Sequence, residues 1–184
     1  MIHDFENQIK DDLHRYLMAQ GEVDEYFDTL LHRLIDAPDI EGKWDAIAQS
    51  YMADGIREFA DYPTVSLGWM MYIGMAVAKL WDEDWARYDA IGDLYLHLRD
   101  PRGYDAMDEH IRGFVLRLKG KDFTALEKLV GECAARTHNQ LRHSGFEPGT
   151  KEAFRAYTAC LHQLYLMGAA VQLKRMGYRM TKVS

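Results

Sequence analysis

The stretch YPTVSLGWMMYIGMAVAKLW, residues 62–81, decides the fold of this chain. No charged residue occurs between Asp61 and Lys79, and the apolar side chains point in every direction around a helix. A helix of that kind must be surrounded by other protein. Asp61 can cap its first turn, Pro63 suits the position that follows, and Lys79 complements the helix dipole at the far end. The sequence therefore predicts a buried central helix over residues 62–81.

A membrane span is the competing interpretation, because the uncharged run is at the lower edge of the length that crosses a bilayer. Glycine and hydroxyl residues dilute its hydrophobicity, and the flanking sequence is polar, so we expect no membrane contact. Gly74, Ala76 and Ala78 supply small side chains. These are tolerated in a helix interior where another helix backbone comes close.

The whole chain is predicted to be a single all-α domain, residues 1–184. Its 48% hydrophobic content allows one substantial core. Apolar residues recur with a period near 3.6, and strand-like alternation is missing. Glycine and proline divide the chain into a bundle of seven or eight helices. The expected helices cover residues 3–20, 22–36, 42–60, 62–81, 82–100, 105–118, 123–143 and 150–179.

Two pairs of segments resemble each other within the chain. DEYFDTLLHRL at residues 24–34 matches DEHIRGFVLRL at residues 108–118, and GMAVA at residues 74–78 resembles GAAVQ at residues 168–172. A duplication of residues 1–82 as 83–184 would give two similar four-helix halves, whose fourth helices pack together through Gly74 and Gly168. Chance similarity between helical sequences explains the matches equally well, so both interpretations stay open.

Charge is distributed unevenly along the chain. Residues 1–100 hold 21 acids and 8 Lys or Arg, a net charge of −13, whereas residues 101–184 hold 8 acids and 14 bases, a net charge of +6; together these give the total of −7. Electrostatic attraction between two packed halves is the favoured explanation, ahead of a basic surface that binds a partner. The basic carboxyl-terminal end lacks aromatic interleaving, so nucleic acid is not an expected partner.

The amino terminus has no basic region followed by an apolar stretch, so it lacks the pattern of a secretory signal. Two cysteines are too few for a disulfide scaffold. A cytoplasmic location is therefore expected. Cys133 and Cys160 lie at similar distances from the loop that joins the last two expected helices, and we expect both to be buried and reduced.

No stretch carries a reaction signature. HExxH, CxxC, GxSxG, the phosphate-binding glycine loop and the dinucleotide fingerprint are missing, and no glutamate is followed three residues later by histidine. We therefore expect no catalytic residues, no cofactor and no metal. The sequence therefore gives no positive evidence for an enzyme, and it does not exclude one.

Two rows of Asp and His at spacings near four residues have ligand types that metals use. Each row lies roughly opposite the apolar stripe of its expected helix and should face water, so a metal would need two rows to meet across a subunit contact. The rows are Asp28, His32 and Asp36 with Glu25 nearby, and Asp89, Asp93, His97 and Asp100.

The last expected helix is the most suggestive functional element, because its apolar residues form two stripes. One stripe includes Tyr165 and Gly168; the other contains His162, Leu166 and Leu173. Two stripes imply two contacts, of which one is the core and the other a subunit interface, a ligand cavity or a neighbouring helix. A core histidine bonded to a polar neighbour is the favoured interpretation of His162, ahead of a ligand contact.

The leading functional hypothesis is a non-enzymatic interaction protein, a homodimer or a partner of another protein. It would make its contact through exposed Met and aromatic residues on the central or last helix. The alternative is a small-molecule-binding bundle with an apolar cavity between those two helices, lined by Trp69, Tyr72, Tyr165 and His162. A metal-dependent enzyme ranks third.

Overall fold

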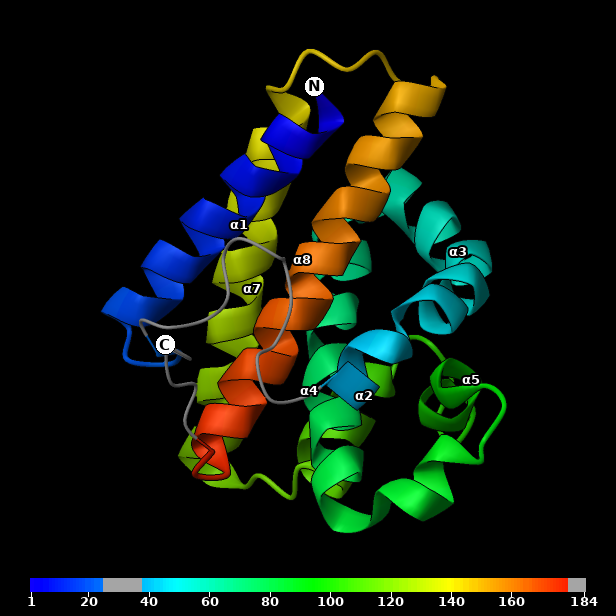
Figure 1. Cartoon of the computed structure of the whole chain (residues 1–184), viewed down its shortest axis with the longest axis vertical. Helices are drawn as coiled ribbons and strands as arrows, with labels where there is room; N and C mark the ends of the chain where they lie inside the picture. Colours follow the sequence, from blue (N-terminus) through cyan, green and yellow to red (C-terminus); the bar gives the residue numbers. More distant parts are fainter. Residues whose placement is uncertain (25–37, 179–184) are drawn as a thin grey trace.

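The computed structural model describes residues 1–24 and 38–178, and these residues form eight α-helices and one π-helix, without a strand (Figure 1). The expected all-α helical bundle is confirmed. None of the described helices combines the length and apolarity that crossing a membrane requires. The elements are α1 (Ile2–Ala19), α2 (Pro38–Gly42), α3 (Trp44–Asp61), α4 (Pro63–Asp89), α5 (Leu94–Arg99), α6 (Met107–His110), η1 (Ile111–Val115), α7 (Gly120–Arg142) and α8 (Lys151–Arg175).

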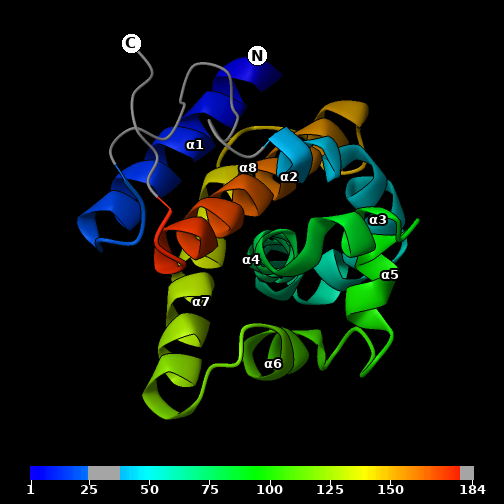
Figure 2. The same cartoon turned by 60° about the horizontal axis from the view of Figure 1, so that its bottom comes forward.

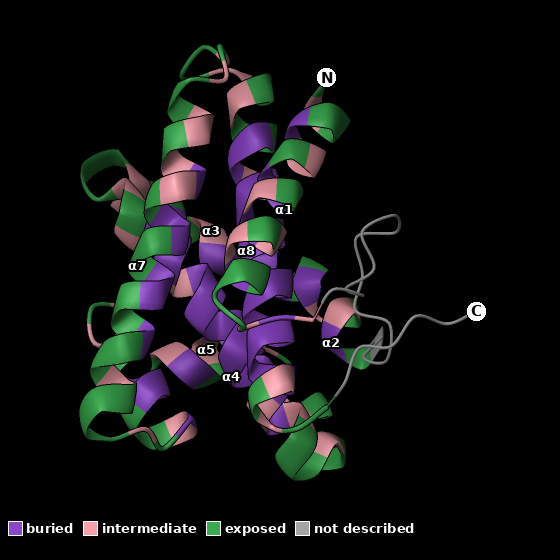
Figure 3. Ribbon diagram, turned by 90° about the vertical axis from the view of Figure 1, so that its left-hand side faces the viewer, coloured by how far each residue is buried: buried purple, intermediate pink, exposed green. Residues whose placement is uncertain are grey.

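Helix α4 is the centre of the bundle, and Figure 2 shows it nearly end-on with the other helices arranged around it. From Ser66 to Leu80, every residue except the half-buried Trp69 and Lys79 is buried. Its most extensive contact is with α8, which is itself buried at every position from Leu164 to Leu173. Figure 3 shows how the buried residues follow the inward faces of the helices around this pair. The sequence prediction of a central buried helix agrees with this arrangement.

Two glycines bring α4 and α8 into backbone contact. A Cβ built on Gly74 would overlap the carbonyl oxygen of Tyr165 and lie 2.9 Å from its carbonyl carbon. A Cβ built on Gly168 would overlap the carbonyl oxygen of Met71 in the same way. Each glycine thus meets the carbonyl three residues before the other glycine. Only residues without a side chain allow this approach, and the predicted pairing of Gly74 with Gly168 is correct.

The expected helix over residues 82–100 is interrupted. Helix α4 continues past Trp81 to Asp89, with a kink at Asp84 (φ −166°, ψ 81°), and α5 begins at Leu94. Asp93 caps α5 by accepting a hydrogen bond from the Leu96 amide at 3.1 Å, and it also accepts one from the Ser50 hydroxyl at 2.7 Å. Asp82, Glu83 and Asp84, the acidic residues at the start of the expected helix, therefore lie within the end of α4.

The expected helix over residues 105–118 consists of α6 followed by the π-helix η1. The Leu116 amide donates to the Ile111 carbonyl at 2.8 Å, five residues back, which widens the turn. Arg117 follows with a φ of 58° in the left-handed region. Most of the expected helix over residues 22–36, the copy of the repeat at residues 24–34 and the row Asp28, His32 and Asp36 lie outside the described residues.

Ion pairs join the acidic first half to the basic second half. Arg136 of α7 pairs with Asp12 of α1 at 3.1 Å. Near the end of α8, Arg175 pairs with Glu22 at 3.1 Å and Lys174 with Asp24 at 3.4 Å. Attraction between the halves, as the charge distribution predicts, is present at these contacts.

Candidate functional site

Trp69 and Tyr72, two predicted site residues, lie on the same side of α4. Their rings meet edge to face at 5.7 Å, and the Trp69 indole donates to the Tyr104 carbonyl at 2.8 Å. The guanidinium of Arg112 covers the Tyr72 ring at 5.6 Å. Burial raises the pKa of Tyr72 well above its ordinary value. The pair packs against the segment that contains α6 and η1.

His162 and Tyr165 form a separate group around Trp44. The His162 ring stacks on Trp44 at 4.9 Å and its Nδ1 lies 3.0 Å from the Glu6 carboxylate. Tyr165 is buried and donates to the Ile40 carbonyl at 2.6 Å. His162 therefore has the polar neighbour that was expected of a core histidine. It borders a shallow depression of about 360 Å³ beside Glu6.

The predicted cavity between α4 and α8 is not found at these residues. The two helices are in backbone contact at Gly74 and Gly168, so no space remains between them at that level. Leu166 and Leu173, on the second stripe of α8, are buried in the core. The two contacts that the two stripes imply are both contacts within the chain, because α8 packs on α4 and also on α1.

The predicted interaction surface would use exposed Met and aromatic residues of α4 or α8, and the methionines of these helices are not exposed. The methionines of α4 and α8 are core residues: Met70, Met71, Met75 and Met167 are fully buried. Phe154, an aromatic residue in the first turn of α8, is 48% exposed and agrees with the exposed aromatic side chains that were expected on the last helix. Methionine in these helices fills the core, as it ordinarily does.

The Asp and His row in residues 89–100 does not form. Asp89 pairs with Lys43 at 2.6 Å, Asp93 caps α5, and Asp100 pairs with Arg99 at 2.8 Å. The break between α4 and α5 separates residues that one continuous helix would have aligned. Within residues 1–24 and 38–178, no group of three or more His, Cys, Asp or Glu is arranged to hold a metal ion.

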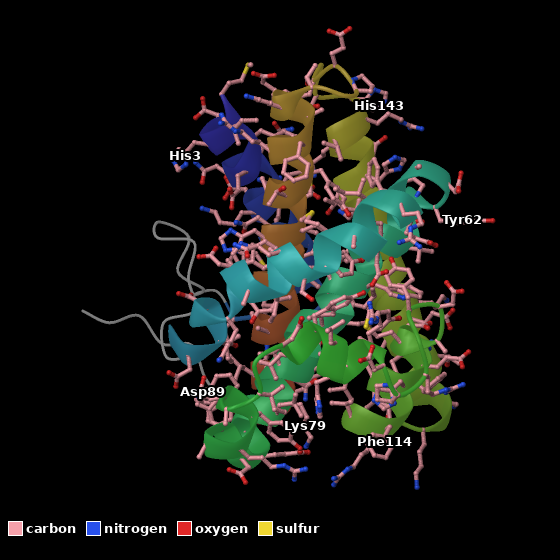
Figure 4. All side chains as sticks on the ribbon, turned by 90° about the vertical axis from the view of Figure 1, so that its right-hand side faces the viewer. His3, Tyr62, Lys79, Asp89, Phe114 and His143 are labelled. Atoms are coloured by element: carbon pink, nitrogen blue, oxygen red, sulfur yellow. The ribbon has the colours of Figure 1, made fainter. Side chains whose placement is uncertain are left out.

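An apolar cavity lies at the end of the molecule where α7 turns into α8. It has a volume of about 620 Å³ and is enclosed by the last turns of α3, the end of α7, the connecting loop and the start of α8. Figure 4 marks this end by the labels His143 and Tyr62. The volume is in the range of small-molecule sites. Its apolar lining consists of Ile56, Phe59, Leu141, Phe146, Ala153 and Phe154 together with Pro148 and Gly149.

A few polar groups converge on this apolar lining. His138 and Arg142 lie one turn apart on α7, and Thr150 caps the first turn of α8 by accepting a hydrogen bond from the Ala153 amide at 3.1 Å. The His138 ring meets the Phe59 ring edge to face at 6.1 Å. Burial, helped by the positive charge of Arg142, lowers the pKa of His138. The neutral imidazole and the Arg142 cation therefore share one wall.

A buried hydroxyl network supports the floor of the cavity at Tyr157. The Ser66 hydroxyl donates to the Gly55 carbonyl at 2.8 Å, so its single proton is used. Tyr157 must then be the donor to Ser66, across 2.5 Å. Its oxygen retains only acceptor capacity. Burial raises the pKa of Tyr157 well above its ordinary value, so the phenol stays neutral.

Electrostatics at this cavity favour a negative ligand group. Arg142 is the charged side chain in the lining, its guanidinium contacts the Asn139 side chain at 3.3 Å, and it forms no ion pair with a described residue. The amino-terminal end of α8 contributes a partial positive charge to the same region. The arrangement can hold an apolar body and an anionic head group, but it does not pair a nucleophile with a base.

Both cysteines are buried free thiols, and burial raises the pKa of Cys133 to about 12. Neither lines the cavity.

Comparisons of the chain with protein-family models, with curated proteins and with solved structures give no match.

The sequence does not predict this cavity, although several of its lining residues lie in predicted helices. Phe154 and Tyr157 follow the apolar pattern of the last helix, which indicates core positions, and His138 belongs to no motif. The sequence signal nearest to the cavity is the loop at residues 144–149, which is rich in Gly and Pro and shortly precedes Phe154.

Proposed function

We propose that this protein is a binding protein for a small, mainly apolar carboxylic acid, held in the cavity between α3, α7 and α8. The observation that carries the proposal is the cavity itself, about 620 Å³ with a mostly apolar lining. Burial of an alkyl or aryl body there supplies the affinity, at about 25 cal/mol per Å² of apolar surface removed from water. The proposal keeps the small-molecule hypothesis and moves its site away from the α4–α8 interface.

The polar groups of the cavity set the orientation of the ligand. Its carboxylate lies beside Arg142 and the first turn of α8, and its apolar end lies toward Phe59 and Tyr157. Arg142 is exposed, so its ion pair with the ligand is screened by water and salt. Its contribution is about 1 kcal/mol, a factor of about five in affinity.

Isothermal titration calorimetry with decanoate and with decanol tests this assignment. Decanoate should bind with a negative heat-capacity change, and decanol more weakly. Ala153→Phe fills the cavity from the first turn of α8 and should abolish binding. Ala135→Phe, at an exposed position of α7, adds the same ring outside the cavity and should leave binding unchanged.

A second pair of variants tests the head group. Arg142→Gln should weaken decanoate about fivefold and leave decanol unchanged. Arg15→Gln, which removes an exposed arginine from α1, should alter neither. Equal binding of decanoate to the Ala153→Phe and Ala135→Phe proteins would refute the proposal.

A homodimer is the second candidate, and the exposure of Ile56 (47%) and Phe154 (48%) at the rim of the cavity favours it. Two copies that meet at this rim would bury both side chains. Light scattering decides between a monomer and a dimer, and Phe154→Ser should shift a dimer toward monomer. The proposal takes the protein to be cytoplasmic, where a reducing environment would keep Cys133 and Cys160 as thiols.

A further inference from the structure

A second cavity lies at the opposite end of the molecule and differs in chemistry from the first. It has a volume of about 740 Å³ and is bounded by the end of α4, by α5, by α6 and by η1. Figure 4 labels Lys79 and Phe114 at this end, far from His143. Both the size and the enclosure by four elements suit a small-molecule site.

Positive charge dominates the lining of this second cavity. It contains Arg87, Arg117, His97 and His110, and Glu83 is the single carboxylate among its lining residues. Glu83 already lies 3.7 Å from the Lys79 ammonium and 3.9 Å from the Arg117 guanidinium.

The Arg87 cation has no carboxylate partner within residues 1–24 and 38–178. Its guanidinium lies over the Tyr88 ring at 5.2 Å and forms no ion pair with a described residue. Among the described lining residues, two arginines face one carboxylate, and an anionic ligand would balance the remaining positive charge.

His110 points to the same conclusion from a different observation. It is only 8% exposed, and its ring stacks on Phe114 at 5.2 Å with an interplanar angle of 16°. Neither ring nitrogen has a hydrogen-bond partner among the described residues, although the ring lines the cavity. Its ring nitrogens are therefore open to the cavity, where one of them can donate a hydrogen bond to an acceptor of the ligand.

The backbone that carries this wall is unusual at two neighbouring places. The π-helix η1 presents Gly113 and Phe114 to the cavity, and π turns are frequent at functional sites. Arg117 then adopts the left-handed conformation at the position where a helix usually ends on glycine. A residue other than glycine is strained at this φ. The strain indicates that the Arg117 guanidinium has a role at the rim of the cavity.

We propose that this second cavity binds a small phosphate monoester whose organic part is a flat ring. A phosphate monoester carries a charge near −1.5 to −2 at pH 7 and accepts paired hydrogen bonds from guanidinium groups, which fits Arg87 and Arg117 with His110. The ring stacks on Phe114, which is 74% exposed at the mouth, and on Tyr88. This site is independent of the carboxylic-acid site between α3, α7 and α8.

Calorimetric titration of the full chain with adenosine 5′-monophosphate tests the site. The nucleotide should bind, and inorganic phosphate and adenosine should each bind at least about tenfold more weakly, because each supplies half of the contacts. Stronger salt should weaken nucleotide binding. Phosphate that binds as tightly as the nucleotide would overturn the stacking part of the proposal, and absence of binding by both would overturn the site.

Arg117→Gly separates binding from folding. Glycine is unstrained at this φ, so the variant should have an unchanged or higher melting temperature and yet bind the nucleotide about tenfold more weakly. Arg87→Gln should also lose about tenfold, whereas Arg57→Gln, on the exposed surface of α3, should lose nothing. Equal effects of Arg87→Gln and Arg57→Gln would refute the proposal. Decanoate binding should be unaffected by Arg117→Gly, so the two sites fail or succeed separately.

Discussion

Replacement of Gly168 by alanine is the sharpest test of how the two core helices meet. The new Cβ would overlap the Met71 carbonyl oxygen and lie 3.1 Å from the carbonyl carbon, where ordinary contacts begin at 3.4 Å. The atoms it meets belong to the α4 backbone, so they cannot rotate away as a side-chain end would. The helices must therefore separate along their most extensive contact.

The expected loss of stability follows from two opposing effects. Overpacking of a core costs about 1–3 kcal/mol, and a backbone neighbour places this site at the upper end. Alanine gains about 1 kcal/mol over glycine in helix propensity, which offsets part of that cost. Gly168→Ala should therefore lower the free energy of unfolding by about 2 kcal/mol, which moves the urea midpoint by about 1 M.

Urea unfolding followed by circular dichroism measures this loss, and Gly131→Ala is the matched control. Gly131 lies within α7, and a Cβ there would meet no atom within 4 Å. That variant should gain about 0.5–1 kcal/mol from propensity alone. If Gly168→Ala is stabilised as much as Gly131→Ala, the backbone contact described for α4 and α8 is refuted.

Two further predictions concern charged groups near the core. Arg112 is 2% exposed and donates a hydrogen bond to Asp108 at 3.0 Å. Arg112→Met should lower the free energy of unfolding, measured with urea, by about 2–3 kcal/mol because it leaves that carboxylate without its partner. Arg102→Met, at an exposed ion pair, should change the free energy of unfolding little. Burial lowers the native pKa of His138 and His110 below the ordinary 6.5, so the unfolded chain binds protons more readily. The free energy of unfolding should therefore be greatest above pH 6.5 and fall as the pH decreases from about 7.5 to 5.5, and replacing both histidines by Gln should reduce this slope in the same measurement.

The central packing could be predicted because its signals are local in the sequence. An uncharged run of apolar residues forms a stable helix only where other parts of the protein surround it. The glycines at positions 74 and 168 mark where the two helix backbones meet. The buried, free state of Cys133 follows from its place on an apolar helix face in the same way.

The helix breaks could not be predicted from periodicity. Asp82, Glu83 and Asp84 have the composition of a first helical turn, yet the chain enters them from a helix that is already formed and held by the core. The expected continuous helix is interrupted at Asp93. Its side chain caps α5 and accepts a hydrogen bond from Ser50, a residue 43 positions away in the sequence. Periodicity contains no information about that partner.

The two cavities escaped prediction for a related reason. A cavity is a space between elements, and its lining comes from residues that have no common period. Phe154 fits the apolar pattern of the last helix, which indicates a core position, but in the first turn of α8 it is 48% exposed. Arg87 and His110 lie 23 positions apart and line the same cavity only because α6 packs back against α4.

The pairing of α4 with α8 also matters for how this chain is synthesised. Helix α4 is complete at residue 89, but α8, with which it makes its most extensive contact, begins at residue 151. The ribosome therefore releases one of the most apolar segments of the chain about 60 residues before the helix that shields it, and non-local contacts of this kind form late. Until α8 emerges, the nascent chain exposes the apolar surface of α4. A chain that ends after α7 should therefore aggregate.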